Sequence, residues 1–185
     1  MRGSAPVRLT VSAAIALALA VGAAPPASAD DAFSKKVDDY SEYWGQRTCR
    51  DKPQEGTLGV VQILRDTFPE QARFSLMRGC NVGPTSEHKD GRAIDWMVSV
   101  RNDDDRDAAE DFIEYLTAKD VDGKKHAHLR RLGVMYIIWN KKILRSYDIK
   151  EGWQRYEGPN NHTSHMHISL SPAGADKRTS FWNRG

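Results

Sequence analysis

Two short stretches of this chain alternate hydrophobic and polar residues with a two-residue period. From Ala93 to Val100, and again from His165 to Leu170, the even-numbered residues are hydrophobic. In the second stretch His165, His167 and Ser169 take the opposite side. This period predicts strands that bury one face and leave the other polar. Three further stretches favour strands: Phe74 to Leu76, and the pair Val134 to Trp139 and Lys142 to Tyr147, which Asn140-Lys141 would join into a hairpin.

Helical spacing of hydrophobic residues appears elsewhere. It predicts a helix over Gly56 to Phe68, ended by Pro69, and a second over Asp103 to Ala118, whose acidic start suits the positive end of the helix dipole. A basic helix is expected over Gly123 to Leu132, and a helix or an irregular segment over Asp30 to Gln46. Strands and helices mix without regular β-α-β spacing. The pattern therefore predicts a single α+β domain with an antiparallel sheet and flanking helices.

The first 29 residues differ in composition from the remainder. They contain Arg2 and Arg8, no acidic residue, an apolar run from Leu9 to Ala24 and a final Ala27-Ser28-Ala29. A positive start, an apolar middle and a small-x-small end are typical of a secretory signal peptide over residues 1–29. The apolar run is short for a membrane span. An uncleaved amphipathic anchor is the alternative.

Removal of the leader changes the charge of the protein. The full chain has 27 basic and 25 acidic residues, and the two arginines of the leader account for the whole excess. The expected domain, residues 30–185, is therefore neutral. A neutral domain disfavours nucleic acid as a partner. We expect a secreted or cell-wall-associated monomer that has no membrane contact once the leader is removed.

Cys49 and Cys80 are the only two cysteines. An oxidising compartment favours a bridge between them, and no C-x-x-C pair is present for a zinc knuckle. On the chain-entropy model, closing this loop would stabilise the fold by about 3 to 4 kcal/mol. The sequence therefore predicts a structural disulfide.

Histidine and aspartate supply the candidate chemistry. His165 and His167 share the polar face of the last predicted strand, His88 lies in a turn-rich loop, and Asp95 lies on the polar face of the following strand. Two imidazoles and one carboxylate would leave a fourth position open for water, as in a catalytic zinc site. A surface histidine or a hydrogen-bonded core aspartate is the alternative for each residue taken alone.

The string Ser86-x-His88-x-x-Gly91-x-Ala93-x-Asp95 resembles the first zinc motif of the LAS metallopeptidases. This group includes lysostaphin-type enzymes, D-Ala-D-Ala carboxypeptidases and the zinc-bearing hedgehog domain. All five fixed positions are present in order.

The downstream His162-x-x-His165-x-His167 is similar to the second motif in penicillin-insensitive murein endopeptidases and in related secreted actinobacterial domains. The stretch from Leu132 to Asn140 also looks like a segment of those domains. The resemblance spans about Arg73 to Leu170.

The resemblance implies a secreted zinc peptidase that hydrolyses peptidoglycan peptide, as a carboxypeptidase or an endopeptidase. His88, Asp95 and His167 would bind Zn²⁺. His165 would act beside the metal on protons or on the transition state, and His162 would lie near the cleft. Arg78 would contact a substrate oxygen.

One position departs from the pattern. The carboxypeptidase branch has glutamate three residues before the last ligand, and this chain has Ser164 there. Serine is a poor base at neutral pH, so proton transfer would fall to His165 or to a residue that the sequence does not identify. Two alternatives follow: a zinc-binding module that binds cell-wall peptide without catalysis, and a metal nuclease drawing on Asn160-Asn161-His162 and the basic 124–131 stretch.

Overall fold

A six-stranded sheet runs through the part of the chain that the computed structural model describes, residues 36–183. All neighbouring strands are antiparallel, in the order β1-β2-β6-β3-β4-β5. The strands are β1 (Phe74–Ser75), β2 (Ala93–Trp96), β3 (Val134–Trp139), β4 (Lys142–Arg145), β5 (Gln154–Arg155) and β6 (Met166–Leu170). The predicted α+β class with an antiparallel sheet is confirmed.

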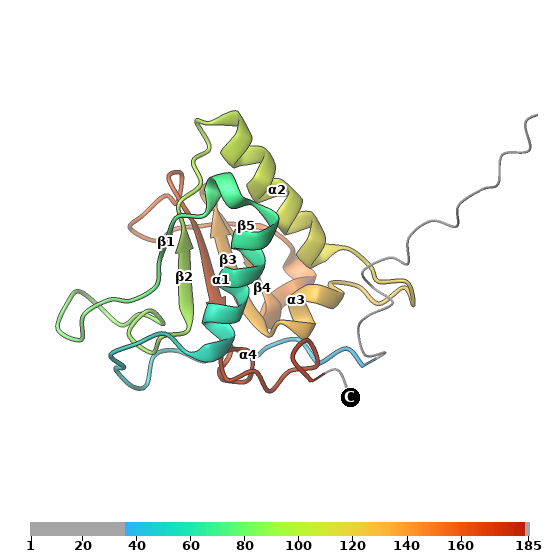
Figure 1. The fold of residues 1–185 in the computed structure, drawn as a ribbon, viewed down its shortest axis with the longest axis horizontal. Coiled ribbons are helices and arrows are strands. Elements are labelled where there is room, and N and C mark those ends of the chain that lie inside the picture. Colours follow the sequence, from blue (N-terminus) through green and yellow to red (C-terminus); the bar gives the residue numbers. More distant parts are fainter. Residues whose placement is uncertain (1–35, 184–185) are drawn as a thin grey trace, which may run out of the picture.

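Helices α1, α2 and α3 cover one face of this sheet, and α4 lies at its lower end (Figure 1). The helices are α1 (Glu55–Thr67), α2 (Asp103–Thr117), α3 (Ala127–Arg131) and α4 (Pro172–Ala175), with 3-10 turns η2 (Pro69–Gln71) and η3 (Ser146–Glu151). The bounds of α1 and α2 agree with the sequence prediction to within one residue. At the start of α2 the side chain of Asn102 accepts a hydrogen bond from the backbone N–H of Asp105 and caps the helix.

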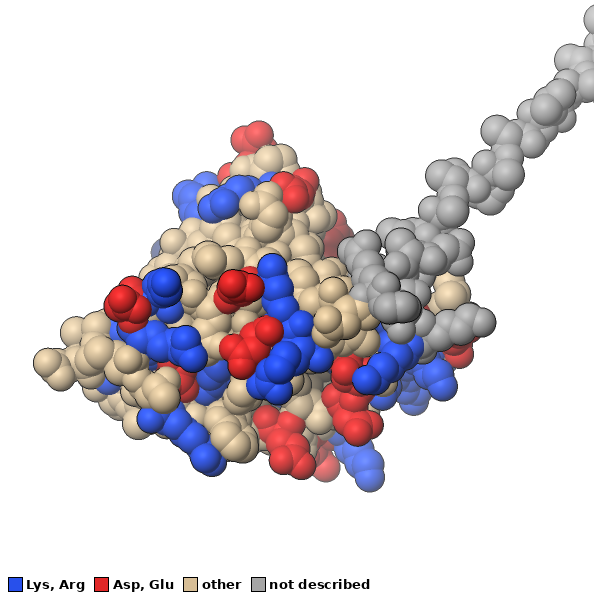
Figure 2. Space-filling model, turned by 60° about the horizontal axis from the view of Figure 1, so that its bottom comes forward, with Lys and Arg blue, Asp and Glu red and all other residues tan. Residues whose placement is uncertain are grey.

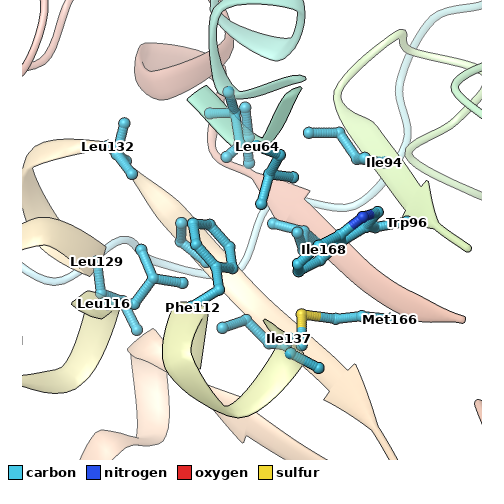
Figure 3. Close-up of a cluster of buried hydrophobic side chains, with 14 of the residues drawn as sticks. Leu64, Ile94, Trp96, Phe112, Leu116, Leu129, Leu132, Ile137, Met166 and Ile168 are labelled. Carbon is cyan, nitrogen blue, oxygen red and sulfur yellow. The ribbon is translucent and has the colours of Figure 1, made fainter. Parts of the chain in front are cut away.

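The alternation along β2 and β6 divides their side chains between the two faces. Ile94 and Trp96 from β2 and Ile168 from β6 are fully buried and point toward the helices, where they meet Leu64 of α1 and Phe112 of α2 (Figure 3). Each such side chain contributes roughly 1.5 to 3 kcal/mol by leaving water. The core therefore lies between the sheet and the helices, and the opposite face is left for polar residues.

Strand β2 and the basic helix α3 are much shorter than the sequence predicts. Strand β2 ends at Trp96 and not at Val100, because the N–H of Val98 bonds to the carbonyl of Trp96 and the chain turns there. The basic helix α3 has five residues. The carboxylate of Asp120 accepts the backbone N–H groups of Asp122 and Lys124 and holds the preceding segment in a turn.

The predicted hairpin is present as β3 and β4, although β4 ends at Arg145 and not at Tyr147, because η3 begins at Ser146. Its two turn residues, Asn140 and Lys141, have φ of 47° and 65°. Positive φ at both positions is what a two-residue type I′ turn requires. Of the entry segment, residues 36–46 form neither helix nor strand. The predicted signal peptide lies outside the described residues. Within residues 36–183 no helix has the length and hydrophobicity to cross a membrane.

Candidate metal centre

His88, Asp95 and His167 meet on the face of the sheet that the helices leave uncovered. Asp95 in β2 and His167 in β6 are directly paired across the antiparallel ladder. Paired residues project to the same face, so these two side chains are adjacent. His88 reaches them from the loop before β2. The structure thus brings together the three residues that the sequence marked as metal ligands.

The donor atoms of the three residues converge. His88 Nε2 lies 3.1 Å from Asp95 Oδ1, and His167 Nδ1 lies 2.9 Å from the same oxygen. One ligand atom from each residue falls within 4.8 Å of the others. A single ion could contact all three atoms, so the group can hold a metal ion.

The hydrogen bonds of His88 prepare its free nitrogen for a cation. Nδ1 lies 3.0 Å from the carbonyl oxygen of Leu76, so in the neutral ring Nδ1 carries the hydrogen and donates it. Nε2 then faces Asp95 Oδ1 with a lone pair, and it is buried without a hydrogen-bond partner. Two lone pairs at 3.1 Å repel each other unless a cation lies between them. The residues present therefore fit a metal ion.

The charge state of Asp95 suits the same role. Burial alone would raise the pKa of Asp95, but the hydrogen bond with His167 and the nearby His88 outweigh it and hold that pKa well below its ordinary value. Burial lowers the pKa of His162 to about 4 and also lowers the pKa of His165. At neutral pH Asp95 is therefore a carboxylate, a form that ligates metals, and the neighbouring His162 and His165 are held toward the neutral form.

His162 and His165 lie beside the three ligands. The ring of His162 is 4.8 Å from that of His165 and 5.8 Å from that of His167. His165 Nε2 is 3.8 Å from Asp95 Oδ1, farther than the ligand nitrogens of His88 and His167. Both histidines line an open pocket of about 300 Å³ together with Asp95, His167 and Arg78. All six predicted site residues are therefore at one place.

Ser164 does not supply a carboxylate, and its hydroxyl lies 3.2 Å from His165 Nδ1. The same pocket is also lined by Glu87 and Tyr136, which the sequence did not predict as site residues. Glu87 is 7% exposed, and its Oε2 accepts a hydrogen bond of 2.8 Å from the Tyr136 hydroxyl. The ring of Tyr136 stacks on that of His167 at 5.5 Å and 19°. Burial, reinforced by Glu87, raises the pKa of Tyr136, so its hydroxyl stays protonated.

Both missed residues had signals in the sequence. Glu87 stands directly before the first ligand, at a variable position of the motif. Tyr136 belongs to the hydrophobic stretch of β3, where it pairs with Ser169 of β6 and so shares the polar face. The register shifts between Val134 and Tyr136, so a strict alternation of faces along β3 does not predict this placement.

A disulfide between Cys49 and Cys80 confirms the predicted bridge, with a Cα–Cα distance of 5.8 Å. It ties the segment before α1 to the loop that carries Arg78. Disulfides persist in oxidising compartments, so the bond fits an extracellular protein. Because the bridge also holds the loop that carries Arg78, it limits the motion of this part of the pocket wall.

A family model described as VldE, C-terminal domain, matches residues 49–167. The match covers more than half of the chain and includes every candidate ligand. No curated protein and no solved structure shows a significant match.

Proposed function

The chain belongs to the family of VldE C-terminal domains, and we propose that it is a secreted zinc-dependent peptidase that hydrolyses peptide bonds of peptidoglycan. The observation that carries this proposal is the convergence of His88, Asp95 and His167, of which Asp95 and His167 line an open pocket. Three protein ligands beside an open space are the arrangement of a catalytic metal site, whereas structural zinc is enclosed by four.

Zinc is the metal that this ligand set suits best. Two imidazoles and one carboxylate favour a borderline ion, and an all-oxygen set would be expected for calcium or magnesium. When bound, zinc polarises a carbonyl group and makes water a stronger nucleophile at neutral pH. The resemblance of the two histidine motifs to those of LAS metallopeptidases supports the same choice.

The residues around the ligands have distinct proposed roles. His165, with a lowered pKa and a place next to Asp95, accepts and returns the proton of the attacking water. His162 lies beside it and narrows the cleft. Arg78 binds an oxygen of the substrate, because its guanidinium is a permanent cation at the pocket rim. The Glu87–Tyr136 pair orients His167 through the stacked ring.

The test is the release of new peptide termini from purified peptidoglycan and from defined muropeptides. We expect activity that a chelator abolishes and zinc restores, and that His165→Ala reduces at least a hundredfold, the scale of one acid–base group. His126→Asn is the matched control, because His126 lies outside the pocket, bonds to Tyr40 and has a left-handed backbone that asparagine tolerates. A zinc-loaded protein that cleaves no muropeptide would contradict the proposal.

A specific observation favours a second function, a zinc-bearing module that binds cell-wall peptide without cleaving it. Position 164 is serine, and its hydroxyl contacts His165, whereas the carboxypeptidase branch of the LAS group has glutamate at the corresponding position. This alternative expects zinc-dependent retention on peptidoglycan with no new termini. Turnover that disappears in His165→Ala would exclude it.

A further inference from the structure

Two exposed tyrosines meet on the surface next to the pocket. The rings of Tyr43 and Tyr147 are 5.4 Å apart, and the side chains are 59% and 39% exposed. Trp44, the next residue along the chain, is 39% exposed and carries the Arg47 guanidinium 3.8 Å above its ring. We call Tyr43, Trp44 and Tyr147 the aromatic patch. It holds three of the six large hydrophobic side chains that are exposed among the described residues.

Buried charges hold the backbone of this patch in place. Arg92 is 2% exposed and donates from Nη2 to the carbonyl oxygens of Trp44 and Gly45. It also pairs with Asp90 at 2.8 Å, and Asp90 accepts hydrogen bonds from the backbone N–H and the hydroxyl of Thr48. A buried ion pair carries a large desolvation cost, so it is weak evidence for stability alone. Here it fixes a segment that presents aromatic rings to solvent.

The aromatic patch adjoins the wall of the metal pocket. The backbone N–H of Trp44 contacts Met135 Sδ at 3.0 Å, one residue before Tyr136, and the hydroxyl of Ser146, one residue before Tyr147, donates to the carbonyl of Val134. Both segments therefore pack against the same end of β3. Tyr43 is also close enough to contribute, after burial, to the raised pKa of Tyr136 and Tyr147.

The chemistry of the aromatic patch suits a saccharide. A pyranose ring has C–H groups on its faces and hydroxyls around its rim, and an exposed tyrosine offers a flat apolar face with a hydroxyl at its edge. Arg47 and Arg145 add donors beside the rings, with Arg145 bonding to Tyr147. An extended peptide would instead use a free strand edge, and Tyr43 and Trp44 come from an irregular segment whereas Tyr147 comes from η3.

We propose that the aromatic patch binds the sugar rings of a glycan chain while the peptide attached to that chain enters the metal pocket. The inference rests on the proposed function for the identity of the polymer, cell-wall glycan. It adds a second, non-catalytic subsite and a preference for peptide that is still joined to sugar.

The test uses the full processed chain and two probes without peptide, the tetrasaccharide of β-1,4-linked N-acetylglucosamine and glycan strands from which the stem peptides have been removed. Titration calorimetry measures the first and co-sedimentation the second. We expect saturable binding by the wild type, and binding roughly tenfold weaker in Tyr43→Ala/Tyr147→Ala, the loss of one or two good ring contacts. Leu58→Ala/Val121→Ala, which removes two exposed hydrophobic side chains elsewhere, should bind like the wild type.

The proposal is overturned if the wild type binds neither probe, if the tyrosine variant binds as well as the wild type, or if binding requires the stem peptides. Thermal melting shows whether each variant is folded, and these surface changes should leave the melting temperature unaltered. His165→Ala separates the two proposals, since it should lose muropeptide cleavage and keep tetrasaccharide binding. Glycan binding without any cleavage by the wild type would contradict the peptidase and leave the sugar subsite standing.

Discussion

The two faces of the sheet are built from the same strands, but one face is apolar and buried and the other carries the polar residues of the pocket. On the helix side Ile94, Trp96 and Ile168 are fully buried among hydrophobic neighbours. On the other side Asp95 and His167, their immediate neighbours in sequence, lie at the pocket. One face therefore gains stability by removing apolar surface from water. The other keeps polar atoms partly unsatisfied, and such atoms are available to a ligand.

Charged side chains of both signs are mixed on the surface of the protein. Figure 2 shows basic and acidic side chains interspersed over the face in view, without a wide field of one sign. The full chain has a net charge of +2. Long-range steering of a charged partner by a large net field is therefore weak, and the proposed recognition by the pocket and the aromatic patch does not depend on it.

Trp96→Ala should have the largest effect on stability. Trp96 is fully buried, packs against Phe68 and Phe112, and donates from Nε1 to the Gln71 carbonyl. Its truncation should lower the free energy of unfolding by about 3 to 5 kcal/mol. Denaturant titration measures this loss. Ser164→Ala, in the exposed segment just before β6, should change it by less than about 0.5 kcal/mol. Equal losses of unfolding free energy in the two variants would contradict the conclusion that stability comes mainly from the helix-covered face.

Removal of the disulfide should come next. The double variant Cys49→Ser/Cys80→Ser should lose about 3 to 4 kcal/mol, because its unfolded chain is no longer cross-linked. Since that chain expands, the dependence of unfolding on denaturant should become steeper, whereas Trp96→Ala should leave the slope unchanged. Reductant should destabilise the wild type and have no effect on the double variant. A wild type that is insensitive to reductant would contradict a stabilising role.

Zinc should stabilise the protein through the pocket face alone. With free zinc at a hundred times its dissociation constant, the gain should be about 2.7 kcal/mol. Thermal melting should show this shift in the wild type and in Ile94→Val, whose change is confined to the core. His88→Ala should show no shift, because the loss of one ligand breaks the set. A similar zinc shift in His88→Ala would place the metal elsewhere.

Tyr136→Phe should have the smallest effect, about 1 kcal/mol, because it deletes the single hydrogen bond to Glu87 and keeps the ring stacked on His167. Denaturant titration again gives the number. Glu87→Gln keeps an oxygen that can accept the same bond and should lose less. If Tyr136→Phe cost as much as Trp96→Ala, this polar pair would be part of the core and not of the pocket wall.

Most of the secondary structure could be predicted from local patterns. The hairpin, α1 and α2 depend on periodicity, on turn residues and on a capping asparagine, all of which act within a few residues. The end of β2 and the short α3 could not be predicted, because a backbone turn at Val98 and the carboxylate of Asp120 decide them. The positions of Glu87 and Tyr136 at the pocket were also not predicted. For Tyr136 the reason is a register shift in β3, which a count of alternating residues does not reveal.

By itself the sequence determined which side chains share a face. The two-residue period is a property of any extended backbone, so His167 had to lie opposite Ile168 wherever β6 was placed. Only the tertiary structure decided that β6 pairs with β2 so that His167 faces Asp95, 72 residues away, and that His88 arrives from a loop. The tertiary structure also brought the ring of Tyr43 next to that of Tyr147. Contacts over such separations depend on the packing of the whole chain, and no local pattern encodes them.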